Sequence, residues 1–286
     1  MKTPAFEQDA LEQLELCLSG ATTLVAKSSQ LSTGVAYALF PAGKRIRPLL
    51  ALALHSDLGG DLEKLVPAAA ALELVHCASL VHDDLPALDN DEMRRGKPTC
   101  HRALGEATAI LTGDVLIPIA FQLLLSALVP DRTKVQLGAA LAEAYAAVCA
   151  GQQLDLTGAA DLATLRAIHG CKTGALFAAA ARFGVLGAER DDLAGVAAEL
   201  GHHIGLAFQI LDDHLDVHGN PAERGRPNGS DARNAKNTFV TLDPAGAGVS
   251  FRDARARTKE ILDSLTSAGC PRTTAILDRL FAGATL

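Results

Sequence analysis

The segment "LVPAAAALELVHCASLVHDD" (65–84) joins a long apolar stretch to two adjacent carboxylates at its end. Alanine and leucine are strong helix formers, and apolar side chains occupy every side of the expected helix. A helix of this kind must be buried among other helices. The segment therefore predicts an all-helical core in which a central helix ends in acidic side chains.

Helical patterns continue on both sides of this segment, and the alternation typical of strands is missing. Residues 108–128 are nearly all apolar, which indicates a second buried helix. We therefore expect an all-α fold, a bundle of long helices that forms one domain over residues 1–286. The stretch 218–237 is rich in Gly, Pro, Asn and charge and predicts a mobile loop inside this domain.

The composition narrows the possible functions. A net charge of −7 over 286 residues argues against a general nucleic-acid binder, which would carry a basic face. No uninterrupted apolar run reaches the length of a membrane span, and the first residues do not resemble a signal peptide. The six cysteines form no CxxC pair, so we expect reduced thiols in a cytoplasmic protein.

An acidic cluster follows the apolar segment directly. Asp83, Asp84 and Asp89 have the order DDxxxxD, and Arg94 and Arg95 come just after them. The proline at position 86 disfavours helix at the residue before it, so the helix should end there and Asp89 should curl back toward Asp83. Carboxylates this close repel one another unless a cation lies between them.

A second acidic cluster lies in "FQILDDHLD" (208–216), where Asp212 and Asp216 share one helical face. Magnesium prefers oxygen ligands and commonly binds through one or two carboxylates together with substrate phosphates. Arginine offers a fork of donors that matches the remaining phosphate oxygens. The two clusters and the arginine pair therefore predict a cradle for metal ions and a diphosphate.

Further basic residues occur in apolar surroundings. "PAGKRIRPLL" (41–50) contains Lys44 and Arg47, and "GCKTGALF" (170–177) contains Lys172. Lys236 lies near the end of the expected mobile loop, and His76 lies two helical turns before the first acidic cluster. These residues are candidates for further phosphate contacts.

Taken together, the ordered motifs resemble the trans-isoprenyl diphosphate synthase (polyprenyl synthetase) family, and in particular the bacterial short-chain farnesyl and geranylgeranyl diphosphate synthases. The resemblance covers roughly residues 35–242 and includes "GKRIRP", "HDDLPALDNDEMRRGKPTCH", "LTGD", "GQQLDL", "KTGALF", "FQILDDHLD" and "SDARNAKNTF". It implies an isoprenoid-synthase bundle around a deep central pocket, usually as a homodimer.

The resemblance also implies a reaction. In this family an allylic diphosphate of five to fifteen carbons ionises, isopentenyl diphosphate attacks the cation head-to-tail (1′-4), and a proton is lost. The cofactor would be Mg²⁺, with about three ions bound by carboxylates and diphosphate.

Carried over residue by residue, the resemblance assigns a role to each candidate. Magnesium would be held by Asp83, Asp89 and Asp212, with Asp84, Asp213 and Asp216 as supporting carboxylates. The allylic diphosphate would be held by Arg94, Lys172 and Lys236, and isopentenyl diphosphate by Lys44, Arg47, His76 and Arg95. Thr173 and Gln209 would direct their oxygens at the developing cation.

Product length depends on residues one to two turns before Asp83. Farnesyl synthases of the similar subgroup usually carry an aromatic residue at the position of Ala78, which limits the product to fifteen carbons. Here Ala78 and Ser79 are small, so we expect a C20 product, with Ile117 or Phe121 on the helix 112–124 as the floor. A farnesyl synthase (C15) is the alternative.

Two remoter readings stay open. A terpene cyclase would use similar carboxylates but would not need a second diphosphate site, which argues against it. A non-catalytic regulatory subunit typically loses carboxylates from one or both clusters, whereas this chain retains them.

Overall fold

The structure is a computed structural model that describes residues 5–25, 30–219, 236–282 and 284. In chain order its elements are α1 (Ala5–Ala21), η1 (Thr22–Leu24), α2 (Gln30–Leu39), α3 (Ile46–Asp57), α4 (Leu62–Asp83), β1 (Met93–Arg94), β2 (Lys97–Pro98), α5 (Cys100–Leu104), α6 (Glu106–Ser126), α7 (Asp131–Thr157), α8 (Leu162–His169), η2 (Gly170–Gly174), α9 (Ala175–Gly187), η3 (Asp191–Leu193), α10 (Ala194–His218), α13 (Phe239–Leu242), α14 (Ala247–Leu265) and α15 (Pro271–Leu280).

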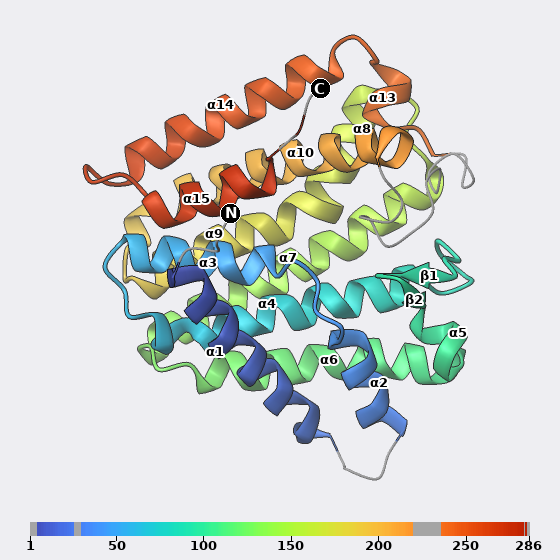
Figure 1. Ribbon diagram of the computed structural model, residues 1–286, viewed down its shortest axis with the longest axis horizontal. Coiled ribbons are helices and arrows are strands. Elements are labelled where there is room, and N and C mark those ends of the chain that lie inside the picture. Colours follow the sequence, from blue (N-terminus) through green and yellow to red (C-terminus); the bar gives the residue numbers. More distant parts are fainter. Residues whose placement is uncertain (1–4, 26–29, 220–235, 283, 285–286) are drawn as a thin grey trace.

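Long helices packed side by side form the body of the molecule (Figure 1). α4 packs along α6, and α9 packs against α3, α7 and α10. Most of the helices share one large hydrophobic core, which extends from α1 to α15. A smaller buried cluster of Val81, Cys100 and Ala109 lies beside it. This arrangement confirms the predicted all-α bundle.

Most of the apolar segment 65–84 belongs to α4, which lies inside the bundle. Its alanines and leucines are buried almost without exception, because neighbouring helices cover it on several sides. By length and composition alone, α4 and α6 could each cross a bilayer. Neither helix contains an uninterrupted apolar run of that length, because Glu73 interrupts α4 and Asp114 interrupts α6. Burial in the core explains why α4 is so apolar, since 72% of its most apolar 18-residue stretch is buried.

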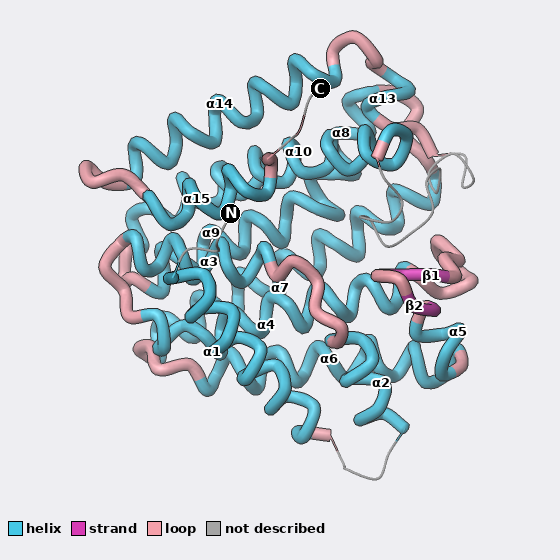
Figure 2. The backbone as a smooth tube through the Cα atoms, viewed as in Figure 1, coloured by secondary structure: helices cyan, strands magenta, loops and turns pink. Residues whose placement is uncertain are grey.

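Within the described part of the chain, strand structure occurs at one place, which the sequence pattern did not predict. Met93 pairs with Pro98 and Arg94 pairs with Lys97 in a short antiparallel hairpin, shown in magenta in Figure 2. Its turn needs two residues in the left-handed region, which are Arg95 (φ 52°) and Gly96 (φ 76°). A strand of two residues is too short to give a period-two pattern, so the hairpin left no signal in the sequence.

The end of α4 matches its prediction. The helix ends at Asp83, and the backbone N–H of Asp89 donates to the Asp83 carbonyl at 2.8 Å. The loop thus curls back as the proline at position 86 suggested. The mobile loop predicted over 218–237 lies mostly outside the described residues, which resume at Lys236, and His218 is the last residue of α10.

Candidate active site

Two lysines lie among the carboxylates of the first cluster. Lys236 Nζ lies 2.8 Å from Asp89 and 2.8 Å from Asp155. Lys172 Nζ lies 2.9 Å from Asp155 and 3.7 Å from both Asp83 and Asp89. Three carboxylates from α4, the following loop and α7 therefore converge on the ammonium groups of two lysines.

Asp155 is the residue of this group that the sequence analysis missed. It belongs to the "GQQLDL" motif, which was noted only as part of the family resemblance. Burial opposes ionisation, yet Lys172 and Lys236 hold the pKa of Asp155 below its ordinary value. Asp155 therefore remains charged and fixes both lysines at the site.

Asp83 has the opposite environment. Burial raises its pKa to about 6, Asp89 adds to the rise, and Lys172 counteracts it. Because burial disfavours the charged form of Asp83, further positive charge nearby would stabilise its carboxylate. The geometry therefore suits a site that receives a cation.

Arg94 is held by a neighbouring carboxylate. Its Nε and Nη2 contact Asp84 at 2.6–2.9 Å in a two-pronged pair, and Nη2 lies 3.5 Å from Asp91. Asp84 is 3% exposed, so it cannot reach a ligand and instead sets the orientation of Arg94. This agrees with a supporting role for Asp84.

In the second cluster the three carboxylates differ in burial. Asp213 and Asp216 are almost fully buried, whereas Asp212 is half-buried. Asp213 accepts from Gln209 Nε2 at 2.8 Å and from the backbone N–H of Phe239 at 3.0 Å. Asp212 is therefore the member that a ligand can reach.

The same network orients two candidate oxygens. The Thr173 hydroxyl donates to Gln209 Oε1 at 2.9 Å, and Gln209 in turn donates to Asp213. Because its amide nitrogen is bound to a carboxylate, Gln209 presents its oxygen beside the threonine oxygen. The structure thus brings together the two residues expected at the developing cation.

Thr173 and Lys172 project from an irregular turn. Gly170–Gly174 forms a π-helical segment between α8 and α9, a feature often found at functional sites. Glycines let the backbones approach closely here, because a Cβ on Gly205 of α10 would lie 2.7 Å from Gly174 Cα. The segment therefore lies directly against the helix that carries the second acidic cluster.

His169, the last residue of α8, comes directly before this turn. Its ring stacks on Phe239 with 5.7 Å between centroids, and burial lowers its pKa to about 4. At neutral pH it is therefore uncharged, and its Nε2 lies 3.8 Å from Asp213, too far for a hydrogen bond.

A second basic group surrounds His76. Arg47 Nη1 lies 3.5 Å from His76 Nε2, and its guanidinium lies 4.6 Å from the centre of the Phe177 ring. Burial lowers the pKa of Arg47 to about 10, and nearby Arg95 contributes to the fall. Burial and these arginines also keep the pKa of His76 well below its usual value.

This second group contains one donor that the protein does not satisfy. Arg47 Nε is buried and has no hydrogen-bond partner among the described residues. A buried, unpartnered donor beside a second cation is costly unless an anion arrives. The Arg47–His76–Arg95 group is therefore a candidate anion site separate from the lysine pair.

Two neighbouring basic residues of the "KRIR" run, Lys44 and Arg45, differ in burial. Arg45 is fully buried, bound to Glu15 and Glu73 at 2.7 Å each and to the Leu39 carbonyl at 2.8 Å. Lys44 is exposed on the other side of the chain reversal, where Arg45 has a φ of 49°. The structure therefore turns Arg45 into the core and leaves Lys44 free to face solvent or ligand.

The residues predicted to limit product length lie along α4 and α6. Ala78 is fully buried, and the Ser79 hydroxyl donates to the His76 carbonyl at 2.8 Å. Ile117 and Phe121 are half-buried on α6, and the Phe121 ring edge lies 4.0 Å from where a Cβ on Gly138 would be. These positions are compatible with a product channel between the helices, but the channel itself remains a prediction.

The donor chemistry fits magnesium. Among the described residues no three His, Cys, Asp or Glu side chains lie close enough to hold a metal ion. However, the oxygens of Asp83, Asp89 and Asp155 already surround positive charge in the form of Lys172 and Lys236. Carboxylate oxygens around a cation are the environment that Mg²⁺ prefers.

Comparison with known proteins agrees with this geometry. The profile of the family described as polyprenyl synthetase matches residues 28–267. The chain belongs to the polyprenyl synthetase family.

Relatives of the chain have two kinds of product in their names. It is 37% identical to the farnesyl diphosphate synthase of Escherichia coli (strain K12), over 89% of each chain. It is 46% identical to the geranylgeranyl diphosphate synthase of Cereibacter sphaeroides, over 74% of each chain. A solved geranyltransferase from Helicobacter pylori, complexed with magnesium and isoprenyl diphosphate, is 29% identical, with a TM-score of 0.82 and 99% of each chain covered.

Proposed function

We propose that this chain is a Mg²⁺-dependent short-chain trans-prenyltransferase that condenses isopentenyl diphosphate with allylic diphosphates of five to fifteen carbons. The observation that carries the proposal is the presence of two separate basic groups in one chain. Lys172 and Lys236 lie among the first carboxylates, whereas Arg47 and Arg95 lie beside His76. Two diphosphate substrates need two such sites, and a terpene cyclase would need one.

The allylic diphosphate would bind at the carboxylate end of α4. Lys172, Lys236 and Arg94 are already held there by carboxylates, so little side-chain entropy is lost when the substrate binds. Asp83, Asp89 and Asp212 would hold Mg²⁺, which neutralises charge on the leaving diphosphate. Fixed positive groups at this point stabilise the ionised state more than the bound substrate.

The allylic cation would meet oxygens and inert side chains. Thr173 and Gln209 lie together through their hydrogen bond and would turn their oxygen lone pairs toward the cation. The surrounding α9 is almost entirely buried and apolar, which keeps water away from a reactive intermediate.

Isopentenyl diphosphate would bind at Arg47, Arg95, His76 and Lys44. Its diphosphate would supply the missing partner of Arg47 Nε and offset the repulsion between Arg47 and Arg95. A neutral His76 can donate one ring N–H to the diphosphate while its other nitrogen faces Arg47.

We further propose that the main product is C20, with farnesyl diphosphate as the alternative. The small, buried Ala78 supports the longer product because no bulky side chain occupies that position on α4. Relatives with both product lengths match the chain, so their names favour neither.

A homodimer is supported by one face of the molecule. Along α6 the exposed residues include Ile110, Leu111 and Leu125, and along α7 they include Val135, Ala139, Ala142 and Ala146. Val135 is 72% exposed and Leu125 59% exposed, which is costly for side chains of this kind in water. A second copy of the chain would cover this face.

A cytoplasmic location and the absence of a nucleic-acid partner stay predictions.

Product mass tests the proposal. Purified protein is incubated with magnesium, isopentenyl diphosphate and one allylic starter of five, ten or fifteen carbons, and the products are dephosphorylated and weighed. We expect a C20 alcohol from each starter. A stop at C15, with the C15 starter unused, would establish the farnesyl alternative, and no condensation at all would refute the proposed function.

A further inference from the structure

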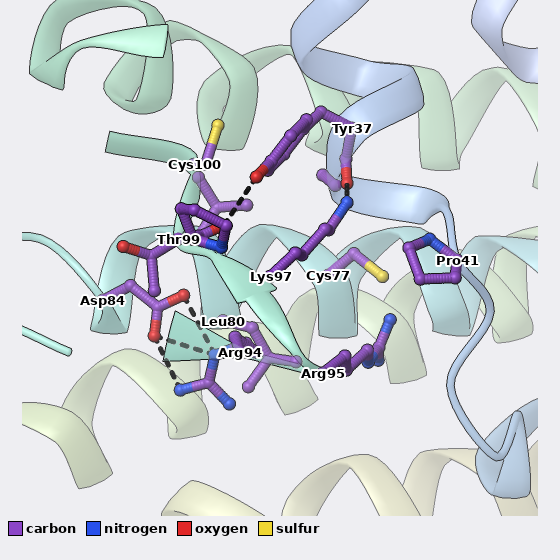
Figure 3. A pocket seen from close by; sticks show the side chains of 13 residues that line it. Tyr37, Pro41, Cys77, Leu80, Asp84, Arg94, Arg95, Lys97, Thr99 and Cys100 are labelled. Carbon is purple, nitrogen blue, oxygen red and sulfur yellow. Dashed lines mark hydrogen bonds and ion pairs between the residues drawn. The ribbon is translucent and has the colours of Figure 1, made fainter. Parts of the chain in front are cut away.

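Lys97 lies at a junction that the proposed roles do not explain. It is in β2, directly after the "RRG" turn, and its Nζ donates to the backbone carbonyl of Tyr37 at 2.6 Å and to that of Phe40. The same ammonium lies 3.6 Å from the centre of the Tyr37 ring (Figure 3). The Tyr37 hydroxyl donates back to the Pro98 carbonyl at 2.6 Å. Hydrogen bonds donated from each side therefore connect the hairpin to the end of α2.

The end of α2 needs these donors. In a continuing helix the Tyr37 carbonyl would accept from the N–H four residues later, but that residue is Pro41, which has none. Lys97 supplies the missing donor, and Arg45 does the same for the Leu39 carbonyl. The last carbonyls of a helix also favour a cation, because the negative end of the helix dipole lies there.

Packing alone does not hold the hairpin in place. A cavity of about 30 Å³ lies between the hairpin, α2 and α4, and Tyr37, Leu80, Lys97 and Cys100 are among its lining residues (Figure 3). This space fits about two water molecules. Where side chains leave such a gap, the polar contacts across its edge determine the position of the hairpin.

The position of the hairpin determines where Arg95 lies. A Cβ on Gly43 would lie 2.5 Å from Arg95 Nη2, so this guanidinium rests directly on the backbone before Lys44. A small displacement of the hairpin from the α2–α3 loop would separate Arg95 from Lys44 and Arg47. Burial lowers the pKa of Lys97, with nearby Arg95 contributing, which places the two cations in one environment.

We propose that Lys97 is a positioning residue that joins the "RRG" turn to the "GKRIR" loop, so that Arg95, Lys44 and Arg47 face one isopentenyl diphosphate. This inference rests on the proposed function. Lys97 touches backbone carbonyls and not the substrate, so its loss should weaken one substrate site and leave the other unchanged.

The experiment compares steady-state kinetics of the full chain carrying Lys97→Met, which keeps the aliphatic stem and removes the ammonium. We expect KM for isopentenyl diphosphate to rise about ten-fold, while KM for geranyl diphosphate and kcat change less than about two-fold. Lys259→Met, at an exposed position on α14, is the matched control and should match the wild type. Lys97→Arg retains a charged donor and should recover most of the wild-type value.

Tyr37→Phe is a second, independent variant. It removes the hydrogen bond from the Tyr37 hydroxyl to the Pro98 carbonyl and keeps the ring. It should raise KM for isopentenyl diphosphate about three-fold, and it decides alone if Lys97→Met does not fold. An active wild type with unchanged KM in Lys97→Met and Tyr37→Phe would overturn the inference. Equal losses for both substrates would do so too, because they indicate general damage. A wild type that condenses no substrate would overturn the proposed function, and this inference with it.

Discussion

At the scale of single residues, Ala78 is the position from which product length can be changed. Its side chain is fully buried on α4, upstream of the carboxylates by more than one turn. Ala78→Tyr adds a ring where the growing chain would pass. We expect products to shift from C20 to C15, measured by mass of the dephosphorylated alcohols.

The geranyl starter is the internal control for Ala78→Tyr. Its extension to C15 should persist, since the diphosphate sites are unchanged, whereas the C15 starter should become inert. An unchanged product distribution would show that the chain grows along another path.

His169 allows a residue-scale prediction about pH. Its pKa is about 4 in the folded protein and about 6.5 when unfolded, so between these values the unfolded chain binds more protons. The free energy of unfolding should therefore fall as pH decreases through this window, by up to roughly 3 kcal/mol from this group. His169→Gln cannot take up this proton and should reduce the fall.

Urea unfolding between about pH 4.5 and 7 measures the effect. Identical slopes for the wild type and His169→Gln would mean that His169 accepts a proton in the folded state.

At the scale of elements, α9 and α10 pack closely because of glycine. A Cβ on Gly201 would lie 2.3–2.4 Å from backbone atoms of Phe177 and Ala178, which cannot give way without moving α9. Gly201→Ala should therefore lower the free energy of unfolding by about 1–3 kcal/mol. Because α9 follows the turn that carries Lys172 and Thr173, activity should fall as well.

Gly195 lies in the same helix and is the matched control. A Cβ there meets nothing within 4 Å, so Gly195→Ala should raise stability by about 0.5–1 kcal/mol through the higher helix propensity of alanine. Denaturant unfolding compares the two variants. Equal changes in both would show that the close approach of α9 and α10 is not a constraint.

At the scale of the whole molecule, the apolar face of α6 and α7 predicts a dimer. Sedimentation equilibrium should give twice the chain mass of 29.7 kDa. Leu125→Arg combined with Val135→Arg places charges on this face and should give the monomer mass, because burying them against a partner is costly.

Val249→Arg is the control for this prediction. Val249 is 48% exposed on α14, a helix that lies far from α6 in Figure 1, and its replacement should leave the mass unchanged. A monomeric wild type, or a double variant that keeps the dimer mass, would contradict the assignment of this face.

The local geometry of the first acidic cluster could be predicted from the sequence because its signals are local. The apolar α4, the break before Pro86 and the return of Asp89 toward Asp83 involve residues close together in the chain. Spacing along a helix likewise placed Asp212 near Asp216. Steric restriction before proline and helical periodicity act over a few residues, so one sequence is enough to show them.

The remaining features depend on contacts between distant segments. Asp155 meets Lys236 across 81 positions of the chain, and Lys97 meets Phe40 across 57. Neither pair has a local pattern, since the role of each side chain comes from what the packed helices bring beside it. The sequence by itself determined an all-helical bundle with two acidic clusters. Only the tertiary structure decided that Lys172 and Lys236 pair with Asp155 beside the first cluster, because burial and long-range packing select among many similar charged residues.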